Sequence, residues 1–87
     1  MPTLLRKGGF FFEMVMYDCR EPKHVHVKGN GKGGAKFWLE PFEVESPGRY
    51  NENELSKIRK IIEDNMALLI QKWEEECARV KSRGAQS

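Results

Sequence analysis

Residues 24–40 read HVHVKGNGKGGAKFWLE, and this stretch decides the fold because it describes a β-hairpin. Apolar and polar residues alternate in His24–Lys28 and again in Ala35–Glu40. That alternation is the two-residue period of a strand that buries one of its faces. Four of the eight glycines lie between the two segments, in residues 29–34. The pattern therefore predicts two antiparallel strands joined by a glycine-rich turn.

The same alternation assigns the faces of this hairpin. Successive side chains point to opposite faces, so His24 and His26 share one face with Lys36 and Trp38. Pairing His26 with Trp38 would set Lys28 against Lys36, and like charges directly opposite each other are unfavourable. We therefore expect His24 opposite Trp38 and His26 opposite Lys36. Apolar side chains take the other face, which should pack against a helix: Val25, Val27, Ala35, Phe37 and Leu39.

Two further strands are predicted before the hairpin. Phe10–Tyr17 is rich in aromatic and branched residues and follows two glycines, so it is typical of a strand, with Thr3–Arg6 as its short partner. After the hairpin, Pro41 ends the strand that carries Trp38. We expect residues 42–50, which contain a Pro-Gly pair, to form a loop with at most a brief extended piece at 42–45.

A different period begins at Asn51, which can cap a helix together with Glu54 three residues later. Apolar residues then recur every three or four positions, which is typical of a helix with one buried stripe. The stripe consists of Leu55, Ile58, Ile62, Met66, Leu69, Trp73, Cys77 and Val80. The predicted fold class is α+β: an antiparallel β-meander of three to four strands packed on one long C-terminal helix over residues 52–79. Residues 1–80 form a single domain, and residues 81–87 form a flexible tail.

The predicted helix is longer than the sheet that it would cover. It would span about 40 Å, whereas strands of seven or eight residues cover about 25 Å. Part of the apolar stripe then needs another cover, and a homodimer or a small cognate protein would supply it. The alternative is that residues 42–50 or the amino terminus fold back over it. The interface candidates are Leu69, Ile70, Trp73 and Cys77.

The composition is that of an ordinary small globular protein. Of its 87 residues, 32% are charged and 39% are hydrophobic, and the net charge is +2. No apolar stretch is long enough for a signal peptide or a membrane span, so we expect a cytoplasmic protein with no membrane partner. Residues 1–41 hold seven Lys and Arg against four Asp and Glu, so an RNA partner is possible. The distant Cys19 and Cys77 predict reduced thiols.

The two histidines have three interpretations. With Lys36 bound to a phosphate, His24 and His26 could exchange protons, which suits metal-independent RNA cleavage. A metal site would need a third ligand, for which the nearest candidates are Asp18, Cys19 and Glu40. None of these has a compelling spacing, so no metal is predicted. The third interpretation is that both imidazoles are solvated residues of an open sheet face.

Other polar and aromatic residues extend this site. Trp38 is typical of a contact surface for a nucleobase or a protein, and the predicted ligand or partner face also includes Glu13, Tyr17 and Glu40. The glycines of residues 29–34 match a dinucleotide-binding spacing, but a strand follows them where that motif requires a helix. No nucleotide cofactor, and no other cofactor, is therefore expected.

Two strand motifs and the start of the helix carry a family resemblance. Residues 21–27 read EPKHVHV, residues 34–41 read GAKFWLEP, and a helix opens near Glu54. Over roughly Thr3–Trp73 the chain resembles a bacterial family of small proteins, domain-of-unknown-function family 4160, which has a Pro-His-Val-His-Val core and an Ala-Lys-Phe-Trp-Leu strand. Lys23 departs from the pattern, which often has a second proline there. The resemblance implies a gene pair of toxin–antitoxin type and carries over no catalytic residue.

Three functions follow as hypotheses. The leading one is a component of a toxin–antitoxin-like pair that acts as a metal-independent RNase through His24, His26 and Lys36. The second is a non-catalytic interaction module that dimerises or binds a cognate partner. The third is a metal-binding module based on the histidines.

Overall fold

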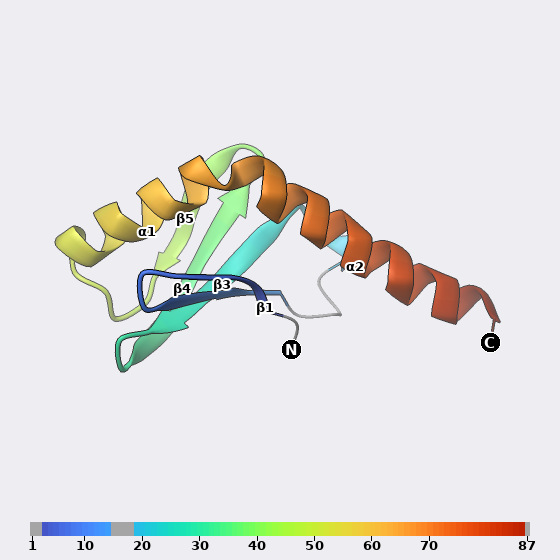
Figure 1. Cartoon of the computed structure of the whole chain (residues 1–87), viewed down its shortest axis with the longest axis horizontal. Coiled ribbons are helices and arrows are strands. Elements are labelled where there is room, and N and C mark those ends of the chain that lie inside the picture. Colours follow the sequence, from blue (N-terminus) through green and yellow to red (C-terminus); the bar gives the residue numbers. More distant parts are fainter. Residues whose placement is uncertain (1–2, 15–18, 87) are drawn as a thin grey trace.

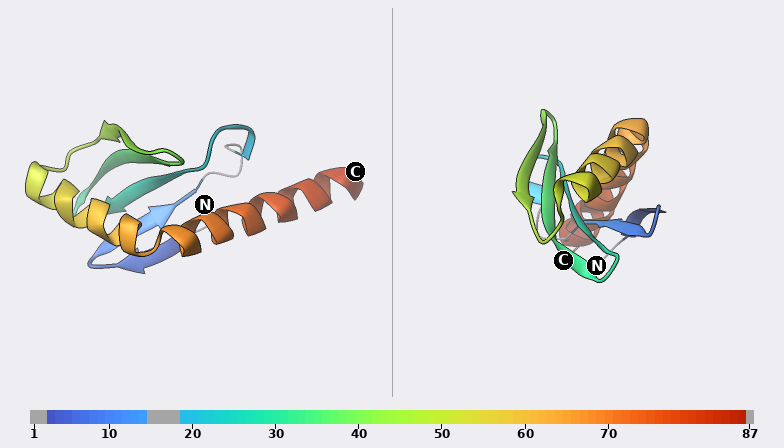
Figure 2. Two further views of the ribbon diagram at one scale, coloured as in Figure 1. Left: turned by 90° about the horizontal axis from the view of Figure 1, so that it is seen from above. Right: turned by 90° about the vertical axis from the view of Figure 1, so that its left-hand side faces the viewer.

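The computed structural model describes residues 3–14 and 19–86, and side chains in these ranges up to Arg79. Five strands form one antiparallel sheet in chain order, and two helices follow them. The strands are β1 (Thr3–Lys7), β2 (Phe10–Glu13), β3 (His24–Gly29), β4 (Lys32–Leu39) and β5 (Phe42–Pro47). The helices are α1 (Glu52–Asp64) and α2 (Met66–Gln86). Both helices lie on one side of the sheet, and the end of α2 extends beyond it (Figures 1 and 2).

The α+β class and the antiparallel meander are confirmed, but the numbers of strands and helices were wrong. Residues 42–47, which we expected to form a loop, form β5. Glu40 and Pro41, joined by a cis peptide bond, make the connection, and Leu39 pairs directly with Phe42. The alternation of apolar and acidic residues in residues 42–45 was the strand signal that the neighbouring prolines obscured. Residues 15–17 of the second predicted strand lie outside the described residues.

The central hairpin has the predicted register and a tighter turn than expected. His24 lies opposite Trp38, and His26 lies opposite Lys36. Only Asn30 and Gly31 form the turn, with φ of 54° and 73°. Two consecutive residues of positive φ are typical of a type I′ turn, whose twist suits a β-hairpin, and Asn-Gly is its preferred sequence. The remaining glycines of residues 29–34 therefore belong to the strands and not to a loop.

The core lies between the sheet and the helices, on the face that the alternation assigned to it. The apolar residues of the hairpin pack with alternate residues of β2 and with the stripe of the helices. This agrees with the predicted pairing of an apolar sheet face with an amphipathic helix. The fully buried apolar members include Phe12, Met14, Val25, Phe37, Ile58, Ile62 and Leu69.

The helical stripe is confirmed from Leu55 to Cys77, and the side chain of Val80 lies outside those described. The single helix was wrong, because the chain breaks at Asn65. The Asn65 side-chain amide donates to the Ile61 carbonyl at 2.8 Å, and its backbone N–H donates to the Ile61 and Ile62 carbonyls at 3.1 Å. Asparagine readily competes for helical carbonyls in this way, so it favours a helix end. The next helix starts at once and continues to Gln86, beyond the predicted end at residue 79.

The chain itself covers much of the stripe that we expected to be an interface. Leu69 is 0% exposed and Trp73 is 4% exposed, and both belong to the same core cluster as Leu4 of β1. Helix α2 also contacts β1. The amino-terminal strand therefore provides the cover that we assigned to a second chain, as in the alternative that the sequence left open. Ile70 is half-buried against the core.

The expectation of reduced thiols was wrong as well. Cys19 and Cys77 form a disulfide, with Cα atoms 5.7 Å apart. Because the two cysteines are 58 residues apart in the chain, their spacing did not indicate that the connection between β2 and β3 lies beside α2. The disulfide thus ties the second helix to the sheet layer.

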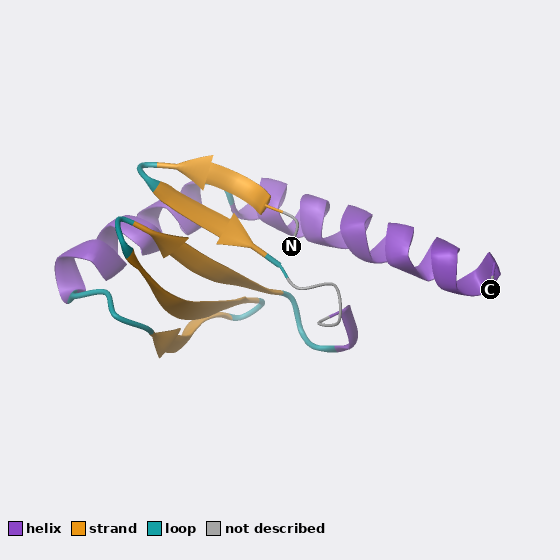
Figure 3. Cartoon of the chain, turned by 90° about the horizontal axis from the view of Figure 1, so that it is seen from below, coloured by secondary structure: helices purple, strands orange, loops and turns teal. Residues whose placement is uncertain are grey.

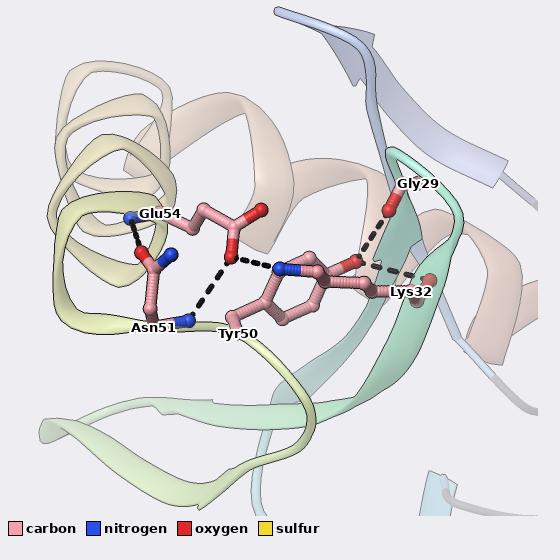
Figure 4. Close-up of polar contacts among 5 residues, drawn as sticks. All are labelled: Gly29, Lys32, Tyr50, Asn51 and Glu54. Atoms are coloured by element: carbon pink, nitrogen blue, oxygen red, sulfur yellow. Dashed lines mark hydrogen bonds and ion pairs between the residues drawn. The ribbon is translucent and has the colours of Figure 1, made fainter.

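A polar junction fixes the start of α1 against the hairpin turn (Figure 4). The predicted capping box is confirmed, because Asn51 and Glu54 exchange backbone and side-chain hydrogen bonds. The Lys32 Nζ donates to Glu54 Oε1 at 2.7 Å, and the Tyr50 hydroxyl donates to the carbonyls of Gly29 and Lys32 at 3.1 and 3.3 Å. The Lys32 hydrogen bond lowers the pKa of Glu54, whereas burial, reinforced by the Glu54 charge, raises the pKa of Tyr50.

Within the described residues, no helix is long and apolar enough to cross a membrane.

Candidate functional site

A row of side chains crosses all five strands on the face of the sheet turned away from the helices, which we call the outer face. The register sets Glu13 opposite His26, and His26 opposite Lys36. Thr3 extends the row on β1 and Ser46 extends it on β5. Figure 3 shows the sheet from this side, with both helices behind it. The register thus gathers polar side chains from five separate strands.

Trp38 lies beside this row and has three neighbours that hold its indole. The Lys36 Nζ lies 4.5 Å from the centroid of the ring, within the range of a cation–π interaction. The indole Nε1–H donates to Glu45 Oε2 at 2.8 Å, and the His24 ring meets the indole edge-on at 5.3 Å between centroids. The side chain is half-buried. Trp38 is therefore a large aromatic group with a defined orientation on the outer face.

A β-bulge positions the acceptor for this indole. Lys36 pairs with Ser46, whereas the next residue, Phe37, pairs with Val44, so Glu45 is an extra residue in β5. A bulge of this kind re-aims a side chain relative to the regular alternation of the strand. Here the re-aimed carboxylate contacts Trp38 on the neighbouring strand.

His24 departs from the expectation of two exposed histidines. Its side chain is 0% exposed, and its Nδ1 lies 2.9 Å from the Pro22 carbonyl. Its ring packs edge-on against those of His26 and Trp73, with centroids 5.0 and 6.3 Å apart. The imidazoles share one region as predicted, but His24 is enclosed by aromatic rings at the start of β3. Only His26, which is half-buried, keeps access to solvent.

The lysines of this region are paired with carboxylates. The Lys28 Nζ lies 3.2 Å from Glu13 Oε2, and the Lys36 Nζ lies 3.8 Å from Glu21 Oε1. Glu13 also accepts a hydrogen bond from the Thr3 hydroxyl at 3.2 Å and is only 6% exposed. The predicted partner-face residue Glu13 is therefore an internal counter-charge for the outer face.

The remaining predicted site residues lie elsewhere. Glu40 belongs to the connection between β4 and β5, and its carboxylate lies 3.2 Å from the Lys23 Nζ. Tyr17 and the metal candidate Asp18 lie outside the described residues. The remaining metal candidate, Cys19, forms the disulfide with Cys77. Within residues 3–14 and 19–86, no three histidine, cysteine or acidic side chains gather as a metal site would require.

Sequence reasoning missed Glu43 and Glu45 as members of the outer face. Glu43 lies opposite Trp38 in the register, and Glu45 holds the indole. Both were placed in a loop with at most a brief extended piece at residues 42–45, although their alternation with Phe42 and Val44 has the period of a strand. With these two carboxylates, the edge of the outer face along β5 is acidic.

Comparison with known proteins identifies the family of the chain. The model of the family described as domain of unknown function (DUF4160) matches residues 9–74. No curated protein and no solved structure matches the chain. The matched segment runs from the turn before β2 to the residue after Trp73, and so includes the whole outer face except β1. On this match the chain belongs to the DUF4160 family.

Proposed function

We propose that this protein is the partner-binding member of a two-protein pair of toxin–antitoxin type, and that it acts by binding its partner without catalysis. The observation that supports the proposal best is the setting of Trp38. Lys36, Glu45 and His24 hold this indole on the outer face. Tryptophan fixed in this way is typical of the residues that dominate protein interfaces, because little conformational freedom is lost on binding.

The charges of the outer face favour a protein partner over RNA. Its lysines already contact carboxylates, as in the Lys28–Glu13 and Lys36–Glu21 pairs, and Glu43 and Glu45 add further negative charge along β5. RNA binding depends on cations that neutralise phosphates. A phosphate at Lys36 would have to compete with Glu21. A protein partner with basic groups matches this surface better.

The hypothesis of a metal-independent RNase is the weaker one on this geometry. General acid–base catalysis requires two groups that both reach the reacting atoms. The His24 side chain is 0% exposed, so one of the two imidazoles is enclosed within the fold. The second candidate proton carrier, His26, lies between Glu13 and Lys36, which suits a residue that shapes a contact surface.

The protein encoded by the adjacent gene is the partner to test. Size-exclusion chromatography with light scattering should find a stoichiometric complex of the two purified proteins. The Trp38→Ala variant should bind at least about tenfold more weakly, because central aromatic residues contribute roughly 2 kcal/mol or more to such interfaces. Leu68→Ala is the matched control, since Leu68 is an exposed apolar residue of α2. Its affinity should not change.

A second arm tests the RNase hypothesis directly. The purified chain and its His26→Ala variant are incubated with RNA in the presence of a chelator. We expect equal and negligible cleavage by both. Cleavage that the substitution abolishes would overturn the non-catalytic proposal, and so would the absence of any complex with the adjacent gene product.

A further inference from the structure

The open edge of the sheet at β5 provides a second recognition element. In the strand order, β5 is the last strand and only β4 pairs with it. One side of an edge strand therefore carries backbone N–H and C=O groups that no strand of the described chain engages. Such an edge is the template to which an extended segment of a partner adds as a further strand.

A groove runs beside this edge, between β5 and the first helix. One hollow is lined by Phe42, Glu43, Val44, Arg59 and Glu63, and an adjoining hollow is lined by Glu52, Leu55, Ser56 and the same Arg59. The three apolar side chains are half-buried. The groove therefore combines a strip of apolar contact area with charged side chains of both signs, along the side of β5 that faces the helices.

The opposite side of β5 is acidic. Glu43 and Glu45 alternate with Phe42 and Val44 along the strand. Glu43 lies opposite Trp38 in the register, and the Glu45 carboxylate contacts the Trp38 indole. Both acidic residues are exposed. A strand added to this edge would place every second side chain beside these carboxylates.

Charge also argues against a second copy of the chain at this edge. Two antiparallel copies of β5 centred on Val44 would set Glu43 of one copy opposite Glu45 of the other. Like charges directly opposite each other are unfavourable. The bulge at Glu45 and the proline at position 47 limit the regular edge to a few residues, so any strand added there must be short.

We propose that β5 binds a short extended segment of the partner in which lysine or arginine alternates with apolar residues. The segment adds to the sheet as a sixth strand. Its basic side chains face Glu43 and Glu45, and its apolar side chains enter the groove beside Phe42, Val44 and Leu55. This inference rests on the proposed function, because it assigns a chemistry to the partner of that function.

A synthetic hexapeptide of alternating lysine and valine is the probe. Titration of the whole protein, followed by amide NMR shifts and by anisotropy of the labelled peptide, should show saturable binding with shifts concentrated in β5 and α1. Glu43→Lys should weaken binding about fivefold, because it replaces an attractive charge pair with a repulsive one. Glu75→Lys, an identical charge change on the exposed surface of α2, is the matched control and should have little effect.

Two modified peptides test the mode of binding. Methylation of alternate backbone nitrogens removes the donors that a sixth strand needs, so it should abolish binding. Replacement of every lysine by glutamate should do the same through repulsion. Binding that survives methylation, shifts that lie outside β5 and α1, or equal effects of Glu43→Lys and Glu75→Lys would overturn the inference. A homodimer of the unmodified chain that NMR maps to β5 would also overturn it.

Failure of this inference can be distinguished from failure of the proposed function. If Glu43→Lys leaves the complex with the adjacent gene product unchanged, while Trp38→Ala disrupts that complex, the partner binds the outer face and β5 is not involved. If the complex does not form at all, the proposed function itself is wrong.

Discussion

The junction at the start of α1 and the outer face around Trp38 are built from the same kinds of groups but differ in what their contacts accomplish. At the junction, Tyr50 and Lys32 satisfy backbone carbonyls and a helix-capping carboxylate. These contacts join two elements of the fold. On the outer face, Lys36 and Glu45 hold an aromatic ring against the surface of the sheet.

The difference indicates which polar contacts are available for function. A hydrogen bond at an element boundary is explained by the backbone groups that it satisfies. The contacts around Trp38 serve no such boundary, since β4 and β5 are already paired through their backbones. Side chains whose contacts the fold does not require are therefore the better candidates for binding a partner.

The largest expected effect separates two adjacent residues of β4. Phe37 is 0% exposed in the core, so Phe37→Ala should lower the free energy of unfolding by about 3–5 kcal/mol. Trp38→Ala should lower it by only about 2 kcal/mol, because the side chain is half-buried and loses one cation–π contact, one exposed hydrogen bond and one edge-on ring contact with His24. Urea unfolding measures both. Equal losses would mean that Trp38 serves the fold, and the comparison of the two clusters would then fail.

The disulfide should have the next largest effect. It closes a chain segment of 58 residues, and loop-closure entropy predicts a loss of about 2–4 kcal/mol in the free energy of unfolding on reduction. The Cys19→Ser/Cys77→Ser variant should match the reduced protein. Amide exchange should accelerate in α2 and remain slow at the start of α1, which the junction holds. Uniform acceleration in both helices would show that the junction does not stabilise α1 independently.

Acid should weaken the junction at the start of α1 through protonation of Glu54. The Lys32 hydrogen bond lowers the pKa of Glu54 below its ordinary value of 4.5. The associated stability is therefore fully present above that value and is lost as the pH falls through the lower pKa of the folded state. Unfolding measured from pH 6 to pH 3 should decline less steeply in Glu54→Gln than in the unmodified protein. Trp38→Ala should keep the original slope, and a shared slope for all three would contradict the assignment.

Local patterns explain how much of this fold could be predicted. Alternation assigned the two faces of the hairpin, and the repulsion of Lys28 and Lys36 selected its register. The spacing of Asn51 and Glu54 located the start of the helix. Each of these features depends on residues that are close together in the chain or that lie opposite each other in a hairpin. Both relations can be inferred from the spacing of residues in the sequence.

The features that the sequence did not predict depend on distant parts of the chain. The burial of His24 requires Trp73 to reach the start of β3, and the disulfide requires Cys77 to meet the connection that carries Cys19. The break at Asn65 was hidden because the apolar stripe continues across it. For the candidate site, alternation placed His26, Lys36 and Trp38 together, but it could not supply the two carboxylates of β5 while that strand was assigned to a loop.

The additional residue of β5 has a consequence for how variation in this chain should be interpreted. Glu45 lies between Val44, which pairs with Phe37, and Ser46, which pairs with Lys36. Excision of this single position would bring the flanking residues into an unbroken ladder without moving Phe42 or Val44 to the wrong side of the sheet. A homologue that lacks this position could keep the same interior and lose only the acceptor of the indole. A one-residue gap at this point in an alignment would thus mark a change in recognition rather than a change in architecture.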